Sequence, residues 1–76
     1  MRAERRPRVR RLRLRCELFY VDAQLIELDG KWLAAVDTVD GPSIGWGWSA
    51  DAALVKALQP FAGMIDELMA SVSWDA

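Results

Sequence analysis

The residues of this chain best suited to chemistry are eight arginines, all within the first fifteen positions and opposed there only by Glu4. A guanidinium group can hold a phosphate through two parallel hydrogen bonds. If residues 11–15 form a strand, alternation places three of these groups on one face, about 6.6 Å apart, which is comparable to phosphate spacing along a nucleic-acid strand. This pattern predicts nonspecific nucleic-acid contact by Arg5, Arg6, Arg8, Arg10, Arg11, Arg13 and Arg15.

The charge of the remaining chain offers the arginines another partner. Residues 1–15 carry 8 − 1 = +7, whereas from Cys16 onward two lysines face ten acids, giving 2 − 10 = −8. The arginines could therefore dock on an acidic surface of the same or a neighbouring chain, or keep an edge strand soluble. No aromatic residue is interleaved among them, so base stacking by this segment is not expected. Both interpretations stay open.

Catalysis and metal binding find little support in the sequence. The chain has no histidine and a single cysteine, Cys16, whose apolar strand neighbours predict an inert thiol. Asp37 and Asp40 could do acid–base chemistry, but acids on such a body usually serve solvation. Gly45 and Gly47 lack the third glycine or the lysine of a phosphate-binding loop. We expect a protein that is not an enzyme and has no cofactor or metal site.

Length and composition predict one small domain. The chain has 76 residues, of which 53% are hydrophobic, and its lone cysteine excludes an internal disulfide. A core of this size gives marginal stability, so a homo-oligomer, most simply a homodimer, is expected. The basic N-terminus lacks the apolar stretch of a secretory signal, and no segment is long enough to span a membrane. The prediction is a cytoplasmic protein without membrane association.

The first half of the domain is predicted to be a hairpin. Residues 1–10 are expected to form a flexible arginine-rich arm, followed by a single α+β domain over residues 11–76. Alternating apolar residues from Arg11 predict a strand that continues to Leu28, with a bulge or break near residues 22–24. Asp29-Gly30 is typical of a two-residue type I′ turn. A second strand should then run from Lys31 to about Thr38.

A third strand, residues 43–48, follows the Asp40-Gly41-Pro42 turn and has two unlike faces. One face carries Ile44 and two tryptophans, and the other carries two glycines. The favoured interpretation places the tryptophans in the core beneath the helices. The alternative places the glycine side beneath the helices and leaves a tryptophan platform for a partner. The candidate partner-binding residues are Trp46, Trp48 and Trp74, of which Trp74 is expected to be the most exposed.

The remaining chain is predicted to be helical. Ser49 is suited to the N-cap position, and the helix dipole favours an acidic residue such as Asp51 in the first turn. Pro60 interrupts the helical pattern, so two segments are expected, at about residues 50–58 and 60–72. They share an apolar face made of Leu54, Leu58, Phe61, Ile65, Leu68 and Val72. The expected fold is α+β, with a three-stranded antiparallel sheet followed by one kinked or two short helices packed on one face. The residues with expected structural roles are Asp29, Gly30, Gly47, Ser49 and Pro60.

Two segments resemble a HicB-type antitoxin domain. The hairpin segment reads Asp29-Gly30-Lys31-Trp32-Leu33-Ala34-Ala35-Val36, and the start of the helix reads Gly47-Trp48-Ser49-Ala50-Asp51-Ala52-Ala53-Leu54. The resemblance covers roughly residues 18–60. Two features depart from the family pattern: Asp40-Gly41-Pro42 replaces the usual Leu-Pro-Gly turn, and the basic arm lies at the end opposite to the family's DNA-binding segment. The resemblance implies a fold, binding to a protein and a tendency to dimerise.

Three functional hypotheses follow. The leading one is a non-catalytic HicB-like module that binds a protein partner, such as a nuclease inhibited in antitoxin fashion, through its sheet and acidic surface. The second is a nucleic-acid-binding protein, for DNA or RNA, that uses the arginine-rich arm. The third is a structural subunit whose arm docks on a neighbouring chain.

Overall fold

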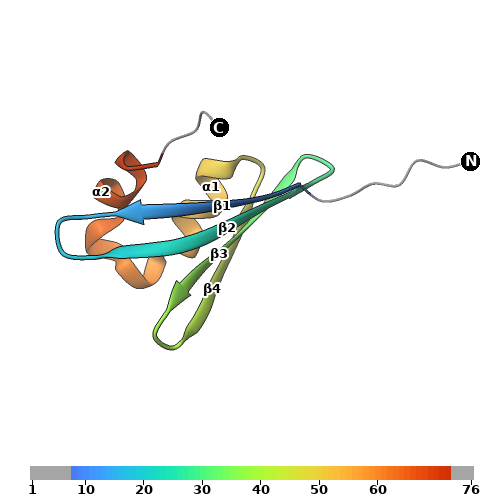
Figure 1. Ribbon diagram of the computed structural model, residues 1–76. Coiled ribbons are helices and arrows are strands. Elements are labelled where there is room, and N and C mark those ends of the chain that lie inside the picture. Colours follow the sequence, from blue (N-terminus) through green and yellow to red (C-terminus); the bar gives the residue numbers. More distant parts are fainter. Residues whose placement is uncertain (1–7, 73–76) are drawn as a thin grey trace, which may run out of the picture.

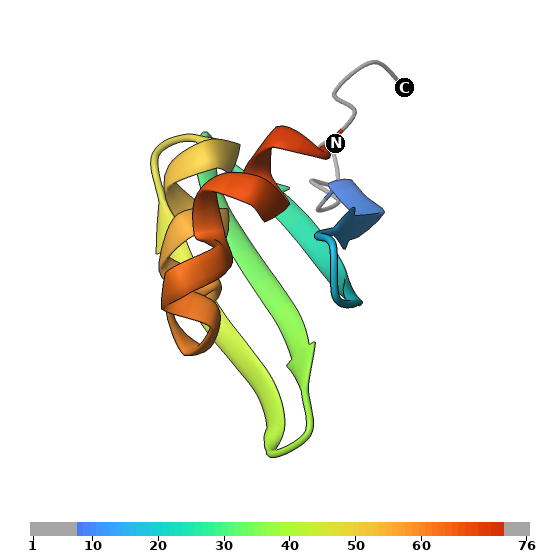
Figure 2. The same ribbon diagram turned by 90° about the vertical axis from the view of Figure 1, so that its left-hand side faces the viewer.

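The computed structural model describes residues 8–72, which fold as a four-stranded antiparallel sheet with helices on one face (Figure 1 and Figure 2). The strands lie in chain order and are β1 (Arg8–Arg15), β2 (Tyr20–Leu28), β3 (Lys31–Thr38) and β4 (Gly41–Gly47). They are followed by α1 (Ala50–Ala57), the 3-10 helix η1 (Gln59–Met64) and α2 (Ile65–Ala70). The α+β class and the antiparallel sheet are confirmed.

The predicted number of strands is wrong. The segment from Arg11 to Leu28 is two strands, not one, and the chain reverses at residues 16–19 instead of bulging near residues 22–24. The Cys16 N–H donates to the Phe19 carbonyl at 2.9 Å and closes this turn. β1 also begins at Arg8, three residues before the predicted domain boundary.

The other two turns follow the chemistry of their residues. Asp29 and Gly30 have φ angles of 55° and 82° between the paired residues Leu28 and Lys31, so the two-residue hairpin is confirmed. In the β3–β4 turn, Gly41 has φ 112°. The Thr38 hydroxyl donates to the Gly41 carbonyl at 2.6 Å and accepts the Asp40 N–H at 3.1 Å.

The helical region confirms the predicted N-cap and the break before Pro60, but the expected second segment, 60–72, is divided into a 3-10 helix and a short α-helix. The Ser49 hydroxyl accepts the Ala52 N–H at 3.1 Å and caps α1. α1 ends at Ala57, and Pro60 lies in the first turn of the 3-10 helix, where its missing N–H is tolerated. Phe61 has non-helical φ and ψ angles of −112° and 41°, so η1 and α2 do not continue α1 as one helix.

The core lies between the helices and one face of the sheet. Its buried residues are Leu14, Val21, Ala23, Leu25, Ala34, Val36, Ala53, Leu54, Ala57, Leu58 and Leu68. Two hydrogen bonds fasten the end of β1 to α2: the Arg15 N–H donates to the Ser71 hydroxyl at 2.8 Å, and the Glu17 N–H donates to a Glu67 carboxylate oxygen at 2.7 Å. Over residues 8–72, no helix is long and apolar enough to cross a membrane.

Candidate interaction surface

The orientation of β4 decides which face of the sheet is left uncovered. A Cβ on Gly45 would lie 2.5 Å from the backbone nitrogen of Ala57, and one on Gly47 would lie 2.7 Å from the Cβ of Ala52. The glycine side of β4 is therefore pressed against α1, with no room for a side chain. Since side chains alternate along a strand, Trp46 is forced to the other face. The prediction that the β4 tryptophans form the core is wrong.

The opposite face of the sheet, called here the open face, has an apolar end. The strand register aligns four of its residues in one row across the sheet, from Val9 through Ile26 and Leu33 to Trp46. Leu28 and Ile44 lie beside this row, and Trp48 follows the end of β4 and contacts Trp46. Trp48 is 69% exposed, and Val9 and Ile44 are each 55% exposed. We call this group the apolar patch; its residues are Val9, Ile26, Leu28, Leu33, Ile44, Trp46 and Trp48.

The two tryptophans of the patch form a cluster with both lysines of the chain. The rings of Trp46 and Trp48 meet edge to face, with centroids 5.8 Å apart. The Lys31 ammonium lies 5.0 Å from the Trp46 centroid, and that of Lys56 lies 5.2 Å from it. Cation–π attraction at these distances restrains the indole rings on the surface.

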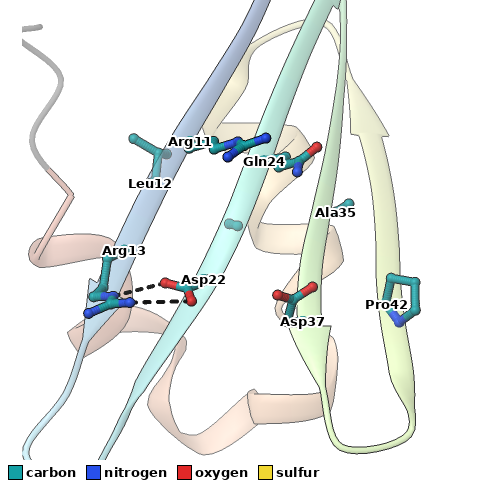
Figure 3. Close-up of a pocket in the computed structure, with 9 residues that line it drawn as sticks. Arg11, Leu12, Arg13, Asp22, Gln24, Ala35, Asp37 and Pro42 are labelled. Carbon is teal, nitrogen blue, oxygen red and sulfur yellow. Dashed lines mark hydrogen bonds and ion pairs between the residues drawn. The ribbon is translucent and has the colours of Figure 1, made fainter.

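The other end of the open face is polar (Figure 3). Arg13 and Asp22 face each other across β1 and β2, with Nε–Oδ1 at 2.8 Å and Nη2–Oδ2 at 3.4 Å. Hydrogen bonding by Arg13 holds the pKa of the Asp22 carboxyl below its usual value, and that carboxylate raises the pKa of Arg13. The Arg13 guanidinium also stacks 4.1 Å from the centroid of Tyr20. Arg11 points toward Gln24 on the neighbouring strand (Figure 3).

The structure divides the predicted phosphate-binding arginines into two sets. Arg11, Arg13 and Arg15 share the open face as the alternation predicted, but the charge of Arg13 is already compensated by Asp22. Arg8 and Arg10 belong to the helix-covered side of β1, where an Arg8 nitrogen lies 3.9 Å from Glu27. Arg5, Arg6 and the tryptophan at position 74 lie outside the described residues.

Acidic side chains gather on the helical layer and in the turns. Asp51, Asp66 and Glu67 are exposed on α1 and α2, and Glu17 and Asp40 are exposed in turns. The open face carries Arg11, Arg13, Arg15 and Lys31 against Asp22 and Asp37, a balance of 4 − 2 = +2. The open face therefore has a net positive charge, whereas the helical side carries both these acids and the cations Arg8, Arg10 and Lys56.

The sequence raised Cys16, Asp37 and Asp40 as candidate residues for chemistry. A hollow of about 710 Å³ lies over the polar end, beside Asp22 and Asp37 (Figure 3). Within residues 8–72, no three cysteine or acidic side chains are placed to hold a metal ion. Cys16 is half-buried and lies in the turn after β1, so its predicted place within a strand is wrong. Asp37 and Asp40 are exposed, at the end of β3 and in the following turn.

Sequence reasoning missed several residues of the open face. Tyr20, Asp22 and Leu33 received no functional role, because the β1–β2 turn was not recognised and neither face of β3 could be assigned to solvent. The usable signal was the Gly-x-Gly of β4 together with the alanines of α1, since small residues on both elements indicate close contact between helix and strand.

Comparisons with known proteins found no matching family model, no matching curated protein and no matching solved structure.

Proposed function

We propose that this protein is a non-catalytic binding module that holds a protein partner on the open face of its sheet. The observation that carries the proposal is the apolar patch: seven large apolar residues on one side of the sheet, which none of the helices within residues 8–72 covers. Contiguous exposed apolar surface is costly in water and marks interaction sites on small soluble domains.

The chemistry of the patch favours protein over a small molecule. It spans all four strands as a broad surface, and its two exposed tryptophans belong to the residue type that most often dominates protein–protein binding. Arg11 and Lys31 lie beside it and would supply part of the polar rim of such an interface. A second copy of the chain is one possible occupant, which keeps the expected homodimer as part of this proposal.

The resemblance to HicB-type antitoxin domains adds a candidate class of partner. Its helix-start segment forms the end of β4, the Ser49 cap and the start of α1, and its hairpin segment forms the 29–30 turn with β3. These features support a HicB-like module as a proposal. Inhibition of a nuclease by occupation of its surface would be one form of the binding proposed here.

Affinity capture with matched variants tests the proposal. Tagged parent chain, Trp46→Ser and Val55→Ser would be expressed in the native host, and the captured proteins compared. Val55 is 37% exposed on α1, so its variant perturbs an exposed apolar residue away from the patch. A partner retained by Val55→Ser and lost by Trp46→Ser supports the open face. Equal capture by all three proteins contradicts it.

Single-stranded nucleic acid is a second candidate ligand. The observation in its favour is that Tyr20 lies beside Arg13 and pairs in register with Arg15, although the sequence suggested no aromatic among the arginines. Arginines and aromatic rings on one face can hold phosphates and stack bases. A salt titration with an oligonucleotide separates the candidates: a steep loss of affinity with salt supports nucleic acid, and no binding at low salt removes it.

A further inference from the structure

The outer edge of β1 has no neighbouring strand within the described residues. In an antiparallel strand, the N–H and C=O of successive residues point alternately toward the partner strand and away from it. Cys16 donates inward to Phe19, so the amides of Arg15, Arg13, Arg11 and Val9 point outward. The bond from the Arg15 N–H to the Ser71 hydroxyl confirms this direction.

Within the described residues, one outward N–H of β1 has an acceptor and the others have none. Within residues 8–72, no acceptor meets the N–H groups of Val9, Arg11 and Arg13. Among the described residues, the hydrogen bonds from the α2 region to this edge reach only Arg15 and Glu17. The uncovered stretch, residues 9–13, is long enough to pair with a short extended peptide.

The side chains along this edge carry uncompensated positive charge on both faces of the strand. β1 contains five arginines. Within the described residues, only Arg13 and Arg8 have acidic partners, Asp22 at 2.8 Å and Glu27 at 3.9 Å. Arg10, Arg11 and Arg15 have none there. An added strand would place its side chains about 5 Å from those of β1 on each face, close enough for acidic residues to meet these arginines.

We propose that the outer edge of β1 binds an extended acidic peptide segment of another protein as a fifth strand of the sheet. Main-chain hydrogen bonds to residues 9, 11 and 13 supply the pairing, and the arginines select acidic side chains. A second copy of β1 does not fit, since it would set arginine beside arginine. The edge of β4 is less suitable because Pro42 lacks an N–H. The proposed site runs along the edge of the sheet, shares only Val9 with the apolar patch, and goes beyond the function proposed above.

A labelled peptide in which glutamate alternates with valine provides the probe, and a lysine–valine peptide the control. Fluorescence anisotropy gives the affinity for the full chain, Arg11→Gln and Arg11→Pro. Both variants remove the same charge, but only proline also removes the outward N–H. The proline substitution leaves the β1–β2 hydrogen bonds in place, since the N–H of residue 11 points away from β2. A glutamate–valine peptide N-methylated at its central residue tests main-chain pairing without altering the protein.

The proposal expects the acidic peptide to bind and the lysine peptide not to bind. Arg11→Gln should weaken binding severalfold, and Arg11→Pro by about tenfold more, because a main-chain hydrogen bond is lost as well. N-methylation should weaken binding to the parent, and bound peptide should slow hydrogen exchange at the Arg11 and Arg13 amides. Trp46→Ser should bind the peptide like the parent, which separates this test from that of the open face.

Two results would overturn the inference. One is equal weakening by the two Arg11 variants together with full affinity for the N-methylated peptide, which would show a purely electrostatic contact. The other is preference for a single-stranded oligonucleotide, with the same affinity in Arg11→Gln and Arg11→Pro, which would assign the strand to nucleic acid. If Arg11→Pro fails to fold, the N-methylated peptide and the exchange data on the parent still decide.

Discussion

Gly45 lies directly beneath the backbone of Ala57, at a distance where an added Cβ would be 2.5 Å from the Ala57 nitrogen. This contact sets α1 against β4 and turns Trp46 toward the other side of the sheet. The existence of an exposed apolar patch therefore depends on a glycine that is itself buried. A chain with a side chain at position 45 could not pack α1 in this place.

Gly45→Ala should destabilise the protein by about 1–3 kcal/mol, because the added methyl group meets helix backbone that cannot move alone. Gly63→Ala is the matched control: nothing lies within 4 Å of a Cβ there, so its cost should stay within about 0.5 kcal/mol. Urea unfolding of both variants measures the difference. Similar stabilities for the two would contradict the close packing of α1 on β4.

The Arg13–Asp22 pair should be visible as a pH effect. The folded-state pKa of Asp22 lies below its ordinary value because Arg13 donates hydrogen bonds to the carboxylate. The pair therefore stabilises the fold above the unfolded-state pKa of about 4 and loses this contribution as the pH falls through the folded-state pKa. An NMR titration of the Asp22 carboxyl should show the low value and a rise in Arg13→Gln. An ordinary pKa, unchanged by that substitution, would show that the pair does not form in solution.

The sequence predicted correctly those features that depend on a few neighbouring residues. Asp29-Gly30 specified its turn through positive φ, and Ser49 specified a helix start through its hydroxyl. The β1–β2 turn was missed because its residues, 16–19, include none of the usual turn residues. Contacts with residues distant in the sequence hold this turn: Glu67 accepts the Glu17 N–H, and the Phe61 ring lies 5.6 Å from that of Phe19. The tryptophan platform of the open face was only the alternative interpretation, because its residues are as apolar as those of the core and only packing distinguishes them.

Gly30→Val should cost on the order of 1–2 kcal/mol, since a β-branched residue would have to adopt the φ of 82° found here. Gly30→Asn is the natural control, because asparagine tolerates positive φ. Thermal unfolding of both variants tests the turn. A melting temperature for Gly30→Val equal to that of the parent would contradict the hairpin geometry.

The effect of an N-terminal deletion on stability should depend on whether the deletion removes residues of β1. Removal of residues 1–7 leaves every paired residue of β1 in place, whereas removal of residues 1–10 also takes the partners of Glu27, Ile26 and Leu25. The shorter deletion should change stability little, and the longer one should lower the melting temperature. If the deleted arginines contact duplex DNA, each lost contact should reduce the salt slope by about 0.9. Equal melting temperatures for the two truncations would place residues 8–10 outside the stable sheet.

The central claim is that a protein covers the open face, and site-specific photo-crosslinking in the native host tests it most directly. A benzophenone amino acid would replace Trp46 in the patch and, as a control, Val55 on α1. We expect a discrete protein adduct from position 46, with another protein or with a second copy of the chain, and none from position 55. Adducts that disappear on nuclease treatment would indicate nucleic acid instead. Absence of any adduct at position 46, or the same adducts at both positions, would contradict the claim.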